Sequence, residues 1–199
     1  MIAIIDYGMG NLRSVQKAFE FLGFDARVTD SKQDLLDASH IVLPGVGAFA
    51  DAIDCLGKSG MQQTMLDEVA KGKPFLGICL GMQLLFDKSY ENGLYAGLSL
   101  VPGEVVLFDV TGLKVPHMGW NNLVARDNAL FDAGNGQYVY FVHSYHAAGV
   151  PDEYIIAEAD YGYRFTAAVQ KDNVFGLQFH PEKSGDTGLA MLRRFGGLS

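Results

Sequence analysis

Two glycines flank a single cysteine inside an apolar segment, and this spacing could serve catalysis. In residues 75–86 (FLGICLGMQLLF), Gly77 and Gly81 each stand two positions from Cys79. Free cysteines are often small core residues, and a helix packed closely through its glycines is one interpretation. The pattern is also the Gly-x-Cys-x-Gly counterpart of the nucleophile elbow, in which small neighbours let a strand turn sharply into a helix. A thiolate held there would be exposed beside the unpaired N–H groups of the helix N-terminus.

A nucleophilic cysteine needs a base that takes its proton and later returns one. Of the five histidines, His180 follows an apolar strand pattern at residues 174–179 and precedes Pro181, which ends strand pairing. Glu182 follows two residues later, where its carboxylate could orient the imidazole and stabilise its charged form. Each residue alone is typical of an ordinary turn. Their combination with the elbow favours a triad of Cys79, His180 and Glu182.

Attack by a thiolate creates an oxyanion, which requires two hydrogen-bond donors. The backbone N–H of Leu80 follows directly from the elbow. A second donor is expected from residues 44–47 (PGVG), because glycines let a backbone approach a ligand closely. The alternative interpretation of this segment is an ordinary strand-to-helix turn, which glycine and proline also favour.

The elements that must position these residues alternate along the first half of the chain. Apolar runs predict buried strands at residues 2–5, 26–29, 40–43 and 74–78, and helical spacing predicts helices at 11–22, from 31, and at 48–56, 61–70 and 80–87. This alternation is typical of a doubly wound parallel sheet covered on both faces, with ligands at the carboxyl ends of its strands. Cys79 falls at that edge.

The second half of the chain is richer in strand patterns. Strands are predicted within residues 101–110, 114–124, 138–145, 155–160 and 165–179, followed by a closing helix at 188–195. We interpret these strands as antiparallel additions to the sheet. The sequence therefore predicts an α/β fold with a mostly parallel, doubly wound sheet, flanking helices and antiparallel strands in the C-terminal half, as a single domain over residues 1–199.

The composition restricts the class of protein. The chain is 49% hydrophobic and 19% charged, with a formal net charge of −8, which disfavours nucleic acid and anionic membranes as partners. No segment approaches the roughly 20 apolar residues that span a bilayer, and the first residues lack the pattern of a signal peptide. Two cysteines, Cys55 and Cys79, make no disulfide framework, so we expect a cytoplasmic protein. We interpret Cys55 as a helix-face residue without chemistry.

Taken together, these motifs resemble the class I, triad-type glutamine amidotransferases. The resemblance rests on residues 77–83 (GICLGMQ), 44–47 (PGVG) and 180–182 (HPE), whose order covers almost the whole chain. It implies a flavodoxin-like core and a reaction in which Cys79 attacks the side-chain amide of glutamine. His180 would protonate the departing ammonia, and water would hydrolyse the γ-glutamyl thioester. The resemblance implies no cofactor and no metal.

The resemblance also implies which residues hold the substrate. The residues that would contact glutamine, through side chains or backbone, are Gly47, Gln83, His143, Ser144 and Tyr145. Gln83 lies one helical turn past Cys79 and would face the same pocket. A zinc site at His143 and His146 is disfavoured, because no third ligand is placed and a strand would send the two side chains to opposite faces.

Four segments make the resemblance more specific. Residues 4–12 (IIDYGMGNL), 44–49 (PGVGAF), 117–121 (HMGWN) and 141–145 (FVHSY) are similar to the glutaminase subunit of imidazole glycerol phosphate synthase. This similarity implies a heterodimer with the cyclase subunit, a (β/α)₈ barrel that receives the ammonia for histidine and AICAR formation. Three residues would lie toward that interface, namely Asn11, Trp120 and Lys183.

The same resemblance implies that activity depends on the partner. Val46 N–H would be the second oxyanion donor and would be mis-oriented until the partner and its ligand bind, so we expect low glutaminase activity from the isolated chain. Because 199 residues leave no length for a synthase domain, the ammonia acceptor is expected on a separate protein. Trp120 or Tyr138 would suit a docking surface if exposed, although both could equally be core aromatics.

Three other functions stay open on the sequence. A glutaminase component of anthranilate or aminodeoxychorismate synthase would share the triad and differ in the N-terminal and 117–121 segments. A γ-glutamyl peptidase would act alone on larger substrates. A catalytically silent regulatory subunit would bind glutamine or a partner, although the joint presence of Cys79, His180 and Glu182 argues against it.

Overall fold

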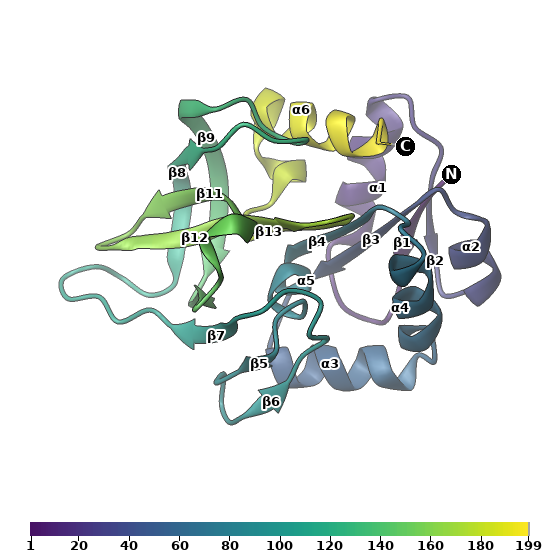
Figure 1. The fold of residues 1–199 in the computed structure, drawn as a ribbon, viewed down its shortest axis with the longest axis horizontal. Coiled ribbons are helices and arrows are strands. Elements are labelled where there is room, and N and C mark those ends of the chain that lie inside the picture. The colour runs from purple at the N-terminus through teal and green to yellow at the C-terminus, as the bar shows by residue number, and fades with distance from the viewer. Residues whose placement is uncertain (199) are drawn as a thin grey trace.

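The computed structural model describes residues 1–198 and is built around one sheet of 13 strands (Figure 1). Five neighbouring strands run parallel, in the spatial order β2 (Ala26–Thr29), β1 (Ile2–Ile5), β3 (His40–Gly45), β4 (Phe75–Cys79) and β13 (Val174–Leu177). The order reverses between β1 and β3, and such a switch point opens a crevice at the carboxyl ends of the strands. The predicted mostly parallel, doubly wound core is confirmed.

Helices cover both faces of the parallel strands, because alternate strand residues point to opposite faces. On one face lie α1 (Leu12–Phe21) and α6 (Gly185–Gly196), which share a core with Ile2 and Ile4. On the other face lie α2 (Lys32–Asp37), α3 (Phe49–Lys58) and α4 (Gln62–Ala70), which share a core with Ala3 and Ile5. In Figure 1, α1 and α6 lie above the parallel strands, and α3 and α4 lie below them. Within residues 1–198, no helix is long and apolar enough to cross a membrane.

The second half extends the sheet mainly with antiparallel strands, as predicted. Beyond β13 the path continues through β12 (Arg164–Lys171), β10 (Tyr145–Ala148), β7 (Glu104–Leu107), β5 (Lys88–Ser89) and β6 (Tyr95–Ala96). A branch leaves β12 through β11 (Ile155–Asp160), β8 (His117–Ala125) and β9 (Gly134–His143). The described residues also include two short 3₁₀ helices, η1 (Asp152–Tyr154) and η2 (Pro181–Lys183).

The strand predicted at residues 138–145 is divided in two. β9 ends at His143 and pairs with β8, whereas β10 begins at Tyr145 and pairs with β7 and β12. Because the two parts hydrogen-bond to different strands, the chain bends at Ser144. This bend lies at the edge of the crevice and changes the direction of the side chains that follow it.

The helix after β4 is shorter than predicted. α5 spans Leu80–Gln83, whereas the apolar spacing predicts a helix over residues 80–87. The carbonyl of Leu84 accepts a hydrogen bond from the N–H of Leu98 at 2.8 Å, and the next carbonyl is used in the same way by the same loop. Before that point the chain already leaves α-helical bonding, because the N–H groups of Leu85 and Phe86 donate to the carbonyls of Met82 at 3.0 Å and Gln83 at 3.3 Å, three residues back. Cys79 is backed by one turn of N–H groups and not by a long helix dipole.

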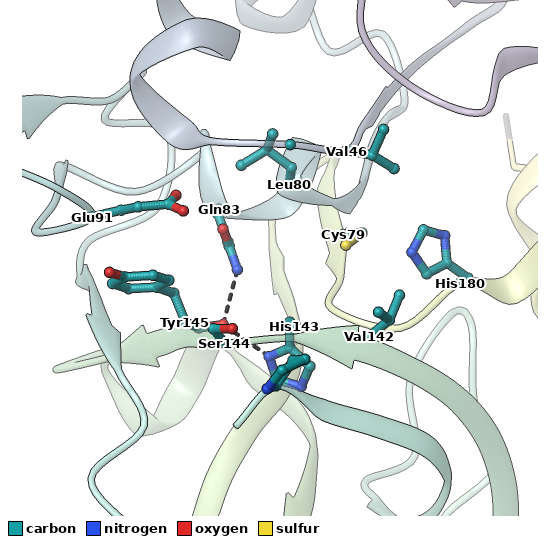
Figure 2. A pocket seen from close by; sticks show the side chains of 12 residues that line it. Val46, Cys79, Leu80, Gln83, Glu91, Val142, His143, Ser144, Tyr145 and His180 are labelled. Carbon is teal, nitrogen blue, oxygen red and sulfur yellow. Dashed lines mark hydrogen bonds between the residues drawn. The ribbon is translucent and has the colours of Figure 1, made fainter. Parts of the chain in front are cut away.

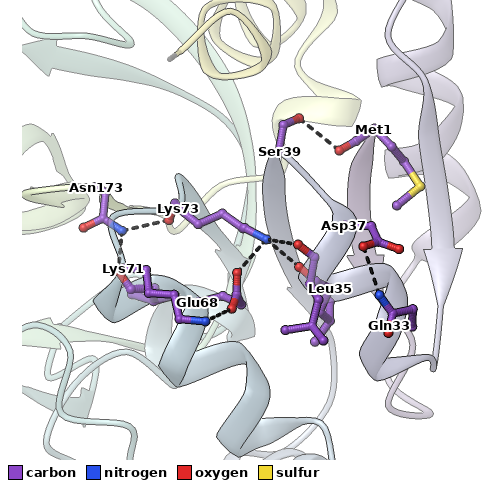
Figure 3. A network of polar contacts seen from close by, with 11 residues as sticks. Met1, Gln33, Leu35, Asp37, Ser39, Glu68, Lys71, Lys73 and Asn173 are labelled. Carbon is purple, nitrogen blue, oxygen red and sulfur yellow. Dashed lines mark hydrogen bonds and ion pairs between the residues drawn. The ribbon is translucent and has the colours of Figure 1, made fainter.

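A lysine with little exposure ties α2 to α4 beside the start of β4 (Figure 3). Lys73 Nζ donates to the carbonyls of Leu35 at 2.6 Å and Leu36 at 2.9 Å, which lie in the last turn of α2. It also pairs with Glu68 Oε2 at 2.8 Å, where the side chains are 12% and 7% exposed. Hydrogen bonds from Lys71 and Lys73 lower the pKa of Glu68. The lysine thus satisfies helix-end carbonyls and a nearly buried carboxylate together.

Replacing this lysine should destabilise the fold without touching the crevice. We expect Lys73→Met to lower Tm by about 5 °C, because it leaves both carbonyls and the carboxylate short of a donor. Lys71→Met is the matched control, since the Lys71 side chain is 66% exposed and reaches the same carboxylate from solvent.

The lowered pKa of Glu68 sets the pH dependence of this effect. Its contribution to stability is present above the ordinary pKa of 4.5 and is lost as pH falls through the lower folded-state value. Thermal melts followed by circular dichroism should therefore show a larger Tm difference at neutral pH than below about pH 4. Equal losses of Tm in the two variants would contradict the role of Lys73.

Candidate active site

The cysteine lies on a strained turn between β4 and α5. Cys79 has φ of 56°, a left-handed conformation that is rare for residues with a side chain and is typical of functional sites. A Cβ on Gly77 would lie 2.6 Å from the carbonyl oxygen of Gly81, and one on Gly81 would lie 1.8 Å from that of Leu43. Both glycines are therefore required by close backbone approach. The elbow interpretation of this segment holds in the structure.

Beside the cysteine lies a buried histidine paired with a carboxylate. His180 Nδ1 and Glu182 Oε1 are 2.8 Å apart, and the two side chains are 3% and 1% exposed. Within residues 1–198, His180 Nε2 and Glu182 Oε2 have no partner at hydrogen-bonding geometry. Catalytic hydrogen bonds of this kind often become shorter only when substrate binds.

The electrostatics of this pair favour a charged imidazole. Burial lowers the pKa of His180, but the nearby sulfur of Cys79 and the carboxylate of Glu182 outweigh burial and raise the pKa to about 9. At neutral pH the ring is therefore protonated beside the sulfur, and a neighbouring imidazolium favours activation of a cysteine nucleophile.

The histidine is held by the backbone as well as by its carboxylate. It follows β13 and caps η2, where its N–H donates to the carbonyl of Tyr140 at 3.0 Å. The Ser184 hydroxyl donates to the His180 carbonyl at 2.6 Å and accepts from the N–H of Tyr140 at 3.0 Å. The backbone of His180 is thus anchored to β9 and to the start of α6. This explains how a residue outside any long element can keep a fixed position.

The segment expected to supply the second oxyanion donor lies directly beside the elbow. Gly45 is opposite Cys79 in the pairing of β3 with β4, and the next residue, Val46, is 41% exposed at the rim of the cavity. The Tyr7 hydroxyl donates to the carbonyl of Pro44 at 2.9 Å and would lie 2.7 Å from a Cβ on Gly45. Tyr7 therefore holds Pro44 and Gly45, which lead into this segment, against the elbow.

A cavity of about 430 Å³ opens in front of the cysteine (Figure 2). It brings together nine of the residues singled out from the sequence: Val46, Gly47, Cys79, Leu80, Gln83, His143, Ser144, Tyr145 and His180. Glu182 lies behind His180. The volume suits a molecule of amino-acid size better than a peptide chain.

One amide in this cavity has a fixed orientation. Gln83 Nε2 donates to the carbonyl of Tyr145 at 2.9 Å and to Gln178 Oε1 at 3.0 Å. Both hydrogens of the amide are therefore used by the protein, which leaves Gln83 Oε1 as an acceptor for a ligand. The Tyr145 carbonyl also accepts from His143 Nδ1 at 2.8 Å, so this backbone atom is already committed to the protein.

The sequence interpretation missed a carboxylate in the cavity. Glu91 lies in the wall at the far end from Cys79 and His180, as Figure 2 shows. Its Oε2 accepts from the N–H of Phe49 at 2.8 Å, at the first residue of α3. Glu91 stands in a polar turn (SYENG) without a motif, and only its place in the fold brings it to the site. A carboxylate there would suit an ammonium group.

The expectation that His143 and His146 point to opposite faces is wrong. Both rings contact Phe108, with centroids at 5.1 and 4.5 Å. The bend at Ser144 explains the difference, because a continuous strand would separate residues at this spacing. His146 Nε2 lies 2.7 Å from the Tyr163 hydroxyl, and within residues 1–198 no group of three or more His, Cys, Asp or Glu side chains could hold a metal ion.

The three residues expected at a partner interface lie outside the cavity lining. Asn11 precedes α1 and accepts a hydrogen bond from Ser14 Oγ at 3.0 Å. Trp120 on β8 is 57% exposed, and Tyr138 on β9 is 56% exposed, so neither is a core aromatic. Lys183 is exposed on η2, immediately after Glu182.

Comparison with known proteins adds the family context. Residues 3–196 match the family model for "Glutamine amidotransferase class-I". "Imidazole glycerol phosphate synthase subunit HisH" of Caldanaerobacter subterraneus is 52% identical over 100% of this chain and 98% of its own length. "Imidazole glycerol phosphate synthase hisHF, chloroplastic" of Arabidopsis thaliana is 45% identical over 98% of this chain, which matches 34% of that longer protein. A crystal structure of a glutamine amidotransferase aligns over 100% of both chains with a TM-score of 0.77 at 19% identity, which supports the fold.

Proposed function

Because this chain belongs to the class-I glutamine amidotransferases, within the family of imidazole glycerol phosphate synthase subunit HisH, we propose that it hydrolyses glutamine and supplies ammonia for histidine biosynthesis. The observation that carries the proposal is the strained Cys79 elbow beside a buried His180–Glu182 pair, at one end of an amino-acid-sized cavity. A silent regulatory subunit would have no need of this strain or of a buried, charged histidine.

The proposed reaction assigns each of these residues a role. The Cys79 thiolate attacks the side-chain carbonyl carbon of glutamine, and the N–H groups of Leu80 and Val46 stabilise the oxyanion. The C–N bond breaks as the His180 imidazolium gives its proton to the leaving nitrogen, which releases ammonia and leaves a γ-glutamyl thioester. His180, now neutral, takes a proton from water, whose oxygen attacks the thioester. Glutamate leaves, Cys79 is regenerated, and Glu182 keeps the imidazole oriented throughout.

We also propose an orientation for glutamine in the cavity. Cys79 and Glu91 stand at opposite ends, so the amide would point to the sulfur and the α-ammonium group to the carboxylate (Figure 2). Gln83 Oε1 would accept from the same ammonium end. Gly47, His143 and the backbone of Ser144 and Tyr145 would hold the rest of the substrate. Since the Tyr145 carbonyl already accepts two hydrogen bonds within the protein, Tyr145 would contact the substrate through its other groups.

We further propose that the ammonia acceptor is a cyclase subunit, a (β/α)₈ barrel, that forms a heterodimer with this chain. This chain matches 34% of the longer Arabidopsis relative, whose name joins HisH with a second component, HisF. That name supports a partner that supplies the second component. The docking surface would include Asn11, Trp120 and Lys183, with Tyr138 on the neighbouring strand β9, and the exposure of both aromatic residues supports this. We also propose that residues 1–199 act as one domain, in the cytoplasm.

The proposed function is tested by glutamine hydrolysis with and without the purified cyclase and its nucleotide ligand. We expect the liganded partner to raise kcat about 100-fold, because one mis-oriented oxyanion donor costs roughly 10²- to 10³-fold. A glutamine-analogue electrophile should label Cys79 and leave Cys55 unmodified. Comparable turnover with and without the partner would refute the proposed dependence of activity on the partner. Labelling of Cys55 alone would refute the proposed glutaminase activity. If the chain bound a chorismate-utilising synthase and not the cyclase, the proposed partner would be wrong.

A further inference from the structure

A chain of hydrogen bonds runs beneath the glutamine cavity between two buried histidines. His117 Nδ1 lies 2.9 Å from His143 Nε2, and the two residues are 3% and 6% exposed. At one end, His143 Nδ1 lies 2.8 Å from the carbonyl of Tyr145. At the other, His117 Nε2 lies 3.2 Å from Asn121 Nδ2. The proposed mechanism uses neither His117 nor Asn121.

The partners at the two ends assign the direction of every hydrogen bond. A carbonyl oxygen only accepts, so His143 carries its hydrogen on Nδ1 and accepts at Nε2 when neutral. His117 must then donate from Nδ1 and accept at Nε2. The Asn121 amide independently supplies a donor there, because its Nδ2 also donates to the carbonyl of Asp160 at 2.8 Å and its oxygen accepts from the N–H of Asn122 at 2.8 Å.

Burial keeps both rings in the neutral form that this direction requires. It lowers the pKa of His117 to about 4 and that of His143 to about 3. The His117 ring is stacked between Phe141 and Tyr161, with centroids at 4.7 and 4.1 Å. Neither ring can therefore reorient freely, and the chain of donors has one direction, from Asn121 to Tyr145.

The last acceptor links this relay to the glutamine site. The Tyr145 carbonyl receives His143 Nδ1–H and one hydrogen of the Gln83 amide, which uses both of its lone pairs. Building on the proposed function, we propose that His117 is a positioning residue, which acts through His143 and the Tyr145 carbonyl to orient the Gln83 amide toward glutamine. The relay lies on the inner side of β8, whose outer side carries the exposed Trp120.

The kinetic test compares two buried histidines in the complex with the cyclase. His117→Phe keeps an aromatic ring in the stack but leaves His143 Nε2 without its donor, and we expect KM for glutamine to rise about tenfold. kcat should change little, because Gln83 binds substrate and transition state alike. His146→Phe is the matched control, since His146 is also buried against Phe108 and lies outside the relay. It should leave KM unchanged.

A purely structural role for His117 would give a different result. It would reduce the active fraction, and so lower apparent kcat while KM stays the same. His117→Asn, whose amide nitrogen can replace Nδ1 as the donor, should bring KM back to within about threefold of the wild type. The proposal would be overturned if KM rose no more in His117→Phe than in His146→Phe. It would also be overturned if KM rose as much in His117→Asn as in His117→Phe.

The direction of the relay has its own spectroscopic test on the isolated chain. Imidazole ¹⁵N shifts should show His117 and His143 neutral, each with its hydrogen on Nδ1, and His117→Phe should move the Nε2 signal of His143. A hydrogen on Nε2 of either ring would overturn the relay. If the wild-type complex does not hydrolyse glutamine, the proposed function and the positioning role both fail, whereas failure of the shifts or of the KM comparison alone removes only the relay.

Discussion

Replacement of Cys79 by alanine is expected to abolish glutamine-dependent synthesis in the complex and to leave ammonia-dependent synthesis by the cyclase intact. The thiolate forms the covalent bond on which both half-reactions depend, so its loss should reduce glutamine turnover by about 10⁵- to 10⁶-fold. Added ammonia bypasses the glutaminase entirely. The two activities are measured side by side on the same complex, with glutamine or an ammonium salt as nitrogen source.

The substitution is small enough to test chemistry and not folding. Alanine removes only the sulfur from a residue that is 7% exposed, and it keeps the Cβ at the same backbone position. Cys55→Ala is the matched control, because this free cysteine lies on α3 outside the cavity lining. Loss of both glutamine- and ammonia-dependent activity in Cys79→Ala would show that the residue supports the complex structurally, and retention of glutamine-dependent activity would remove it as the nucleophile.

The parts of the site that are local in sequence could be predicted from the sequence. The glycines around Cys79 have a spacing that only a close turn explains, and the structure places the backbone of Gly81 2.6 Å from a Cβ on Gly77. His180 and Glu182 are separated by one residue, so a proline-terminated strand end is enough to bring them together. The parallel core was predictable for a related reason, because strands buried on both faces leave continuous apolar runs.

The parts that were missed depend on contacts between distant segments. Glu91 reaches the cavity because α3 presents the N–H of Phe49 to it, a contact that spans 42 positions. The helix after Cys79 ends at Gln83, where the backbone bonds tighten to a spacing of three residues and a later loop then binds the carbonyls of Leu84 and Leu85, and apolar spacing carries no information about that loop. The bend at Ser144 likewise follows from a change of partner strand. Pattern reasoning describes one segment at a time and cannot resolve such exchanges.

Glu182→Gln should reduce turnover strongly while glutamine binding changes little. Glutamine has the shape of glutamate and can still accept from His180 Nδ1, but it lacks the charge that stabilises the imidazolium. In catalytic triads the loss of this carboxylate costs up to about 10⁴-fold in kcat, so we expect a reduction of roughly 10³-fold or more with KM within about threefold. Glu153→Gln, an exposed glutamate in the other 3₁₀ helix, is the matched control and should retain wild-type kinetics.

The pH dependence distinguishes this electrostatic role from simple loss of structure. Burial lowers the pKa of His180, whereas Cys79 and Glu182 raise it to about 9, so removal of the Glu182 charge must lower it. The leaving nitrogen needs the protonated ring, which persists in the wild type until pH approaches 9 and is lost above it. In Glu182→Gln the alkaline limb of the kcat profile should therefore move to lower pH, and the ratio of wild-type to variant kcat should grow between pH 6 and 9. A lower kcat with an unmoved alkaline limb would mean that Glu182 holds the turn in place without tuning the histidine, because a purely geometric defect slows the reaction equally at every pH.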